Sequence, residues 1–146
     1  MGVSKTKLKG AMHDAILEIF KMVEEITGVT EAAIISSNRS VATVDARKIL
    51  ANILRKRLQL TCYQVAHYMK IDHSSVVYYE KMHLVHIEEP EYRRMYSAVS
   101  GMIALNATKD AEELLSTKLK ELHTQTEELL NTLNAQVKVL DIIKKL

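Results

Sequence analysis

The chain has 146 residues, a net charge of +2 and an apolar content of 47%, which is enough for one packed domain with an appendage and excludes a disordered polymer. Its single cysteine excludes an intramolecular disulfide framework and indicates a reducing compartment such as the cytoplasm. No apolar run approaches the ~20 residues that span a bilayer, and no apolar stretch follows the basic start, so we expect neither a signal peptide nor a membrane partner.

The first expected element is a helix over residues 11–27, because apolar side chains recur there at helical spacing. Gly28 stands where such a helix commonly ends. Residues 1–10 are expected to form a basic flexible tail. The apolar positions of this helix are Met12, Ile16, Ile19, Phe20, Val23 and Ile26.

A short helix, a polar loop and a longer basic helix follow. Thr30 can cap a helix that ends at Ile35, residues 36–44 lack periodicity, and Asp45 can cap a helix that runs to about Leu58. Four apolar side chains of the longer helix are expected to face inward: Ile49, Leu50, Ile53 and Leu54. Five basic side chains are expected to face mostly outward: Arg47, Lys48, Arg55, Lys56 and Arg57.

Two further helices are predicted close together. Thr61 and Gln64 have capping-box spacing, which opens a short helix. Lys70 and Ile71 then form a turn, and Asp72 is the expected N-cap of a helix that reaches about His86, with its carboxylate accepting a backbone amide of the first turn. A short helix, a tight turn and a capped second helix make a helix–turn–helix arrangement.

The start of that last helix carries His73, Ser74 and Ser75, which are small or flat polar side chains that both donate and accept hydrogen bonds. A helix end with such groups suits the major groove of DNA, where base edges present donors and acceptors. The same end carries partial positive charge, which favours a nearby phosphate.

The C-terminal part is expected to be one long helix. Pro90 fits its first turn, and Gly101 and Asn106 are the candidates for a break. Apolar residues alternate steps of four and three, with Thr126 and Gln136 as polar members, so we expect a self-associating coiled coil; the alternative is an amphipathic helix that folds back on the first domain. The expected oligomerisation residues are Leu115, Leu119, Leu122, Leu129, Leu133, Leu140 and Ile143.

The expected fold is therefore all-α: a small helical bundle with a helix–turn–helix over residues 11–87, followed by a helical oligomerisation or interaction region over residues 88–146. Residues 1–87 carry a net charge of +4 and residues 88–146 a net charge of −2. This asymmetry is compatible with a nucleic-acid module followed by an interaction module.

Residues 16–87 resemble the C-terminal DNA-binding domain of the bacterial replication initiator DnaA, a small Trp-repressor-like helical bundle. The resemblance keeps the family's order of elements. The matching segments are Val29-Thr30-Glu31-Ala32-Ala33-Ile34-Ile35, the loop Ser36-Ser37-Asn38-Arg39-Ser40, the basic helix start Ala46-Arg47-Lys48-Ile49 and Asp72-His73-Ser74-Ser75-Val76. The last segment is similar to the family signature Asp-His-Thr/Ser-Thr/Ser-Val.

The resemblance implies a role for each matching polar residue. Arg39 would enter the minor groove of DNA, where a narrow A·T-rich segment concentrates negative potential. Asp72, His73 and Ser74 would touch base edges in the major groove. The residues implied to contact phosphates are Arg47, Lys48, Arg55, Tyr63, Ser75 and Tyr78.

The sequence also departs from the family pattern. Ile71 stands where the family usually has arginine, Ser74 where it often has threonine, and Asn38 and Val41 where members carry further arginines. These differences bear on the target sequence more than on DNA binding itself. No Gly-x-x-x-x-Gly-Lys-Ser/Thr run is present, so we expect no ATPase activity.

The expected function is sequence-specific binding of double-stranded DNA, as a replication or transcription regulator that acts as a homo-oligomer. The alternative is a helical interaction module that has lost DNA binding. Catalysis, a cofactor and a small-molecule substrate are not expected, because no paired carboxylates or nucleophile elbow is evident. His83 and His86 have ligand spacing but no third or fourth ligand, so no metal site is expected.

Overall fold

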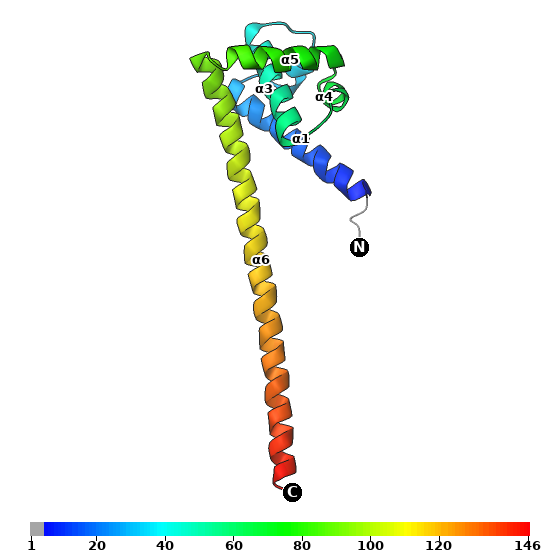
Figure 1. The fold of residues 1–146 in the computed structure, drawn as a ribbon, viewed down its shortest axis with the longest axis vertical. Coiled ribbons are helices and arrows are strands. Elements are labelled where there is room, and N and C mark those ends of the chain that lie inside the picture. The colour runs from blue at the N-terminus through cyan, green and yellow to red at the C-terminus, as the bar shows by residue number, and fades with distance from the viewer. Residues whose placement is uncertain (1–4) are drawn as a thin grey trace. The chain divides into compact units, whose positions relative to one another are not determined.

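The computed structural model describes residues 5–146, with side chains from residue 9 onward. This part of the chain contains helices and no strand, so the predicted all-α fold is confirmed. Two compact units are distinguished, one up to Ala104 and one from Leu105, and each is described by itself. The helices are α1 (Lys5–Thr27), α2 (Glu31–Ile34), α3 (Val41–Arg57), α4 (Cys62–Met69), α5 (His73–His86) and α6 (Pro90–Lys144) (Figure 1).

The first helix is longer than predicted. α1 begins at Lys5, so residues 5–10 are helical where a flexible tail was expected, and residues 1–4 lie outside the described part. The predicted end at Thr27 is confirmed, and Gly28 follows with a φ of 72°, a left-handed conformation that suits glycine. Four of the predicted apolar positions are buried: Ile16, Ile19, Phe20 and Val23.

α3 begins earlier than the sequence suggested, and the predicted loop over residues 36–44 is correspondingly shorter. Ser40 is the N-cap, because its Oγ accepts a hydrogen bond from the backbone amide of Thr43 at 3.3 Å. The Asn38 side chain in turn accepts from the amide of Ser40 at 2.8 Å. These local bonds fix the helix start before Asp45, which therefore lies inside α3 rather than at its cap.

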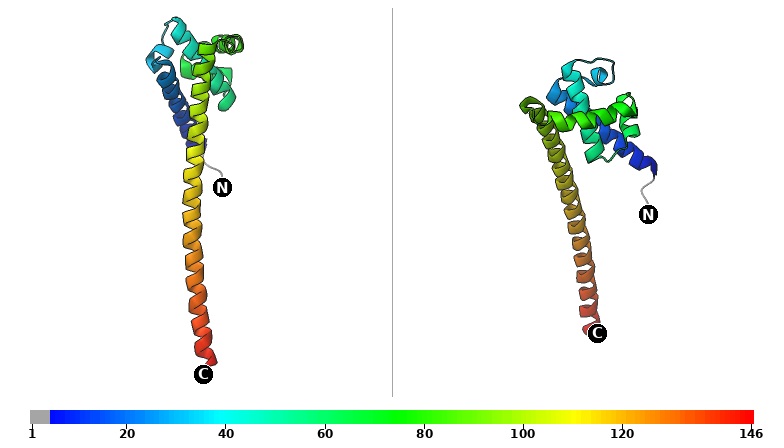
Figure 2. Two further views of the ribbon diagram at one scale, coloured as in Figure 1. Left: turned by 90° about the vertical axis from the view of Figure 1, so that its left-hand side faces the viewer. Right: turned by 45° about the horizontal axis from the view of Figure 1, so that its top comes forward.

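α3 is the centre of the N-terminal unit, since it contacts α1, α2, α4 and α5. The two views of Figure 2 show these helices gathered around it. Its middle is buried on every side, from Ala46 to Leu54. The four predicted inward residues, Ile49, Leu50, Ile53 and Leu54, all belong to this core.

The predicted helix–turn–helix is present. The Thr61 hydroxyl accepts from the Gln64 amide at 3.2 Å, and the Gln64 side chain accepts from the Thr61 amide at 2.9 Å, so the capping box opens α4 as predicted. α4 closes at Lys70, whose φ of 54° is left-handed. The chain turns there, and α5 starts at His73.

α6 runs from Pro90 to Lys144 without the interruption considered at Gly101 or Asn106. Its first turns belong to the N-terminal unit, where Tyr92 and Val99 are buried in the core. The boundary between units therefore lies after Ala104, beyond the expected boundary at residue 87. None of the helices that the structure describes is long and apolar enough to cross a membrane.

A buried polar cluster joins α6 to the bundle. The Nδ1 atom of His83 lies 2.6 Å from the hydroxyl of Tyr92. The hydroxyl of Tyr96 donates to Oδ1 of Asn52 at 3.0 Å. The ring of His83 also contacts the rings of both tyrosines. Burial is the main cause that lowers the pKa of His83 to about 4, and the nearby Lys56 charge adds to it.

This cluster predicts acid sensitivity. The unfolded chain binds a proton at His83 with a pKa near 6.5, whereas the folded chain binds it only near 4. The free energy of unfolding should therefore fall as the pH decreases from about 6.5 to about 4. A His83→Asn variant keeps a polar atom near Tyr92 and should lose part of this dependence. Urea unfolding at pH 7, 6 and 5 measures it, with His123→Asn on an exposed helix face as the control; identical pH profiles for His83→Asn and wild type would contradict the assignment.

Candidate nucleic-acid interface

A groove lies between the loop that follows α2 and the N-terminal end of α5. It collects residues that are far apart in the sequence. Among the residues predicted to bind DNA, those that line it are Arg39, Arg47, Asp72, Ser74, Ser75 and Tyr78. Lys70, Ser36 and Ser37 also line it. The structure thus brings the predicted minor-groove arginine and most of the predicted α5 residues to one concave surface.

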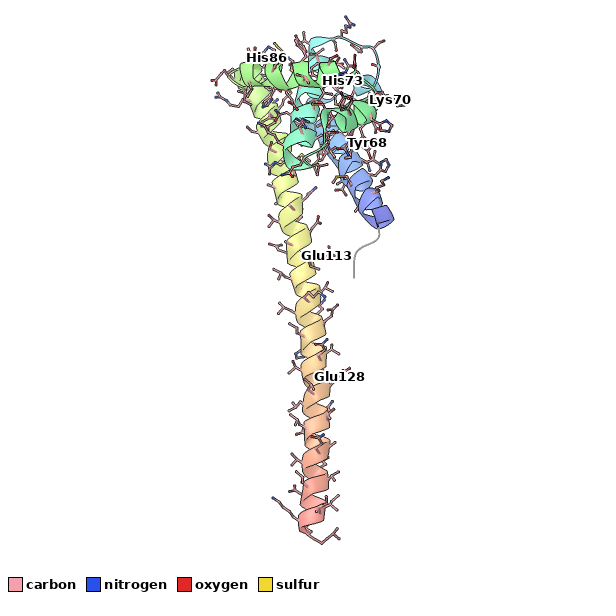
Figure 3. All side chains as sticks on the ribbon, turned by 45° about the vertical axis from the view of Figure 1, so that its right-hand side comes forward. Tyr68, Lys70, His73, His86, Glu113 and Glu128 are labelled. Atoms are coloured by element: carbon pink, nitrogen blue, oxygen red, sulfur yellow. The ribbon has the colours of Figure 1, made fainter. Side chains whose placement is uncertain are left out.

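His73 lies next to this groove and is held by two neighbours. Its ring stacks on the ring of Tyr63, with centroids 4.7 Å apart and an interplanar angle of 25°. Its Nδ1 atom is 3.0 Å from Oδ1 of Asp72. The His73 side chain nevertheless remains 49% exposed, at the start of α5 (Figure 3). The imidazole is therefore both oriented and accessible.

The role predicted for the Asp72 carboxylate as a helix cap is wrong. No backbone amide of α5 donates to its side chain, and the amide of Ser75 instead bonds to the backbone oxygen of Asp72 at 3.0 Å. The carboxylate is turned toward His73, the adjacent residue. The first turn of α5 therefore lacks a side-chain cap, which leaves its partial positive charge available to a ligand.

Arg47 does not face solvent as predicted. It is 4% exposed, and its guanidinium donates to four backbone carbonyls of α2 and the following loop. The acceptors are the carbonyl oxygens of Ala33, Ile34, Ser36 and Asn38, at 2.5–3.2 Å. A planar guanidinium with five donors can satisfy such a set. Arg47 thus shapes the loop that carries Arg39, and its burial speaks against the predicted phosphate contact.

Lys48 is likewise buried, at 5% exposure, where an outward position was predicted. Its Nζ lies 3.1 Å from Oδ1 of Asp45 and 2.6 Å from Nδ1 of His86. It also lies 5.8 Å from the centre of the Tyr92 ring. With its charge paired inside the bundle, Lys48 is not placed to meet a phosphate.

Arg55 is partly exposed but already paired. Its Nε bonds to the Glu80 carboxylate, and its Nη1 donates to the Leu60 carbonyl at 2.6 Å. The Glu80 hydrogen bond raises the pKa of Arg55, so the guanidinium stays charged. This local neutralisation weakens any attraction of Arg55 for a phosphate.

One cation at the groove was missed in the sequence. Lys70 was interpreted only as a turn residue, yet its exposed side chain lines the groove with Arg39. Its position between α4 and α5 was the available signal, because the turn of a helix–turn–helix lies beside the N-terminal end of the second helix. Ser75 and Tyr78 add hydroxyl groups to the same surface, and Tyr63 keeps 69% of its surface exposed beside His73.

The predicted oligomerisation residues lie in the second unit, on α6. Every residue from 107 to 146 is exposed, including the seven apolar members of the heptad seam. Figure 3 shows side chains around Glu113 and Glu128 projecting from the helix. A helix with this much apolar exposure is typical of a surface that a partner covers.

Comparisons with protein-family models, with curated proteins and with solved structures returned no match to this chain.

Proposed function

We propose that the chain is a sequence-specific double-stranded DNA-binding protein, a DnaA-like helix–turn–helix regulator that acts in the cytoplasm and self-associates through α6. The observation that carries this proposal is the groove that places Arg39 opposite the start of α5. An exposed arginine, Arg39, and the polar N-terminal end of α5 border this one concave surface, and both are suited to contact bases.

The position of the groove suits the surface shape of a DNA duplex. The minor and major grooves of DNA are separated by a sugar–phosphate strand, so a protein that reads both needs a hollow for that strand. Arg39 would reach the minor groove and α5 the major groove. Lys70, Ser75 and Tyr78 line the hollow between them, where cationic and hydroxyl groups suit phosphate oxygens. Arg47 then supports the loop from inside rather than touching DNA.

His73 supplies the best placed base-reading group. Its ring is fixed by Tyr63 and accessible, and an imidazole hydrogen-bonds to the major-groove edges of bases. Fixing the ring before binding reduces the entropy lost when a base is read. Ser74, which lines the groove beside it, offers a second donor and acceptor.

Selection from a random-sequence pool of duplexes tests the proposal. The full-length protein should enrich a defined motif over several rounds at moderate salt, and a double variant Arg39→Ala, His73→Ala should not. An unenriched pool from the wild-type protein would contradict sequence-specific binding, while retention of DNA without enrichment would indicate only electrostatic attraction.

A further inference from the structure

The apolar surface of α6 changes width along the helix. The seam alternates d and a positions of a heptad, in the order Leu115, Leu119, Leu122, Thr126, Leu129, Leu133, Gln136, Leu140 and Ile143. Before residue 129 the flanking e and g positions are polar, as in Ser116, Lys118 and His123. This first stretch is the narrow seam of an ordinary coiled coil.

From residue 129 onward both flanks become mainly apolar, with Thr132 and Lys144 as their polar members. Leu130 and Val137 occupy e positions, and Val139 and Leu146 occupy g positions. All four are more than half exposed. Positions g, d, a and e are adjacent around a helix and together cover about 150° of its circumference. We call this surface, the a, d, e and g positions of residues 129–146, the wide face.

A shallow depression lies on the g side of the wide face, lined by Thr132, Ala135, Gln136, Val139 and Leu140. A similar depression lies on the e side of the narrow stretch, lined by Leu115, Ser116, Leu119 and His123 among others, so places that can receive side chains of a neighbouring helix occur along both stretches. The charged residues lie away from the wide face: Lys138, Asp141 and Lys145 are on the opposite side of the helix, and only Lys144 falls on a flank. One partner helix covers positions a and d, so a face this wide needs neighbours on both sides.

The neighbours that fit are copies of the same helix. Residues 105–128 carry a net charge of −3 and residues 129–146 a net charge of +2, so an oppositely directed copy offers complementary charge. In an antiparallel pair centred on residue 131, Leu122 meets Leu140. The two polar seam residues, Thr126 and Gln136, then meet each other, so that no apolar seam residue faces a polar one.

We propose that α6 joins four copies of this chain in an antiparallel four-helix bundle, with the wide face as the surface that makes the assembly larger than a dimer. Two copies then enter the bundle from each end. If the proposed DNA-binding function holds, on which this last step rests, one assembly binds two duplexes at once.

Mass determination tests the number of copies. Light scattering of the full-length protein at tens of micromolar should give four times the chain mass of 16.6 kDa. The triple variant Leu130→Gln, Val137→Gln, Val139→Gln leaves the a and d positions intact and should give a twofold lower mass. The matched triple Ser116→Gln, Lys118→Gln, His123→Gln should remain a tetramer. A wild-type mass of one, two or three chains overturns the proposal, whichever way the variants behave.

Disulfide cross-linking tests the direction. In a Cys62→Ser background, the double variant Leu122→Cys, Leu140→Cys should form intermolecular disulfides on mild oxidation. The single variant Leu122→Cys should not, because neighbouring antiparallel helices hold its sulfurs in different layers, and the two copies that run in the same direction lie diagonally across the bundle, beyond the reach of a disulfide. A cross-linked single variant would overturn the antiparallel arrangement.

A two-duplex capture assay tests the consequence for DNA. Beads that carry one selected duplex should retain a second, fluorescent duplex with wild-type protein. The triple variant Leu130→Gln, Val137→Gln, Val139→Gln should retain much less of it, because a dimer offers one copy at each end where the tetramer offers two. If the wild-type protein holds the first duplex as a tetramer and retains no second one, simultaneous binding is overturned. If it holds no duplex at all, the DNA-binding proposal fails while the tetramer mass still stands.

Discussion

Replacement of Arg47 by methionine is expected to lower the free energy of unfolding by about 3 kcal/mol, the cost typical of losing one partner of a buried charged hydrogen-bond network. Methionine fills much of the same volume, but it leaves four buried or half-buried carbonyls without the donors that now satisfy them. Urea unfolding monitored by circular dichroism measures the loss.

The matched control is Arg57→Met at the end of the same helix, where the side chain is exposed and the expected change is within about 0.5 kcal/mol. The Arg47 variant should also lose affinity for a selected duplex, because the loop that carries Arg39 is no longer fixed. A variant as stable as wild type would show that the carbonyls find other partners, and the structural role assigned to Arg47 would be wrong.

His73→Ala and Arg39→Ala are each expected to weaken binding to a selected duplex by about 5- to 150-fold, the range for losing one base contact of about 1–3 kcal/mol. Binding to an unrelated duplex should change much less, because it depends on phosphates. Fluorescence anisotropy with both duplexes at one salt concentration measures the two effects.

The neighbour of His73 provides a finer test. Tyr63→Phe keeps the stacked ring and should bind close to wild type if stacking is the main role of Tyr63, whereas Tyr63→Ala releases the imidazole and should lose part of the affinity. Lys120→Ala, on the exposed surface of α6, is the control for a general charge effect. Wild-type affinity in both His73→Ala and Arg39→Ala would remove these residues from the proposed interface.

The helices were predictable because each carries its own periodic pattern or capping pair. Thr61 and Gln64 are an example, since both hydrogen bonds of the capping box join residues three apart. The start of α3 was not predicted, because Ser40 and Asp45 are both good caps by type, and Ser40 is selected by its contacts with Asn38 and Thr43.

Which basic side chains are buried and which are exposed could not be deduced from the sequence. Arg47 bonds to carbonyls 9–14 residues earlier, and Lys48 meets His86 across the bundle. A helical pattern predicts which way a long side chain leaves the helix, but not whether another element covers it. Lys70 differs from Arg47 and Lys48 because its side chain stays exposed. Its place beside Arg39 could not be predicted, since the groove forms only when the loop after α2 and the start of α5 come together.

The left-handed backbone of Lys70 lowers the stability of the fold, while its side chain supplies a positive charge to the groove. A side chain in this left-handed conformation costs about 1 kcal/mol relative to glycine, the residue that usually closes a helix in this way. Glycine would relieve the strain but remove a cation from the groove. Selection for thermal stability alone would favour glycine at this position. Retention of lysine here would therefore indicate selection for binding at the groove.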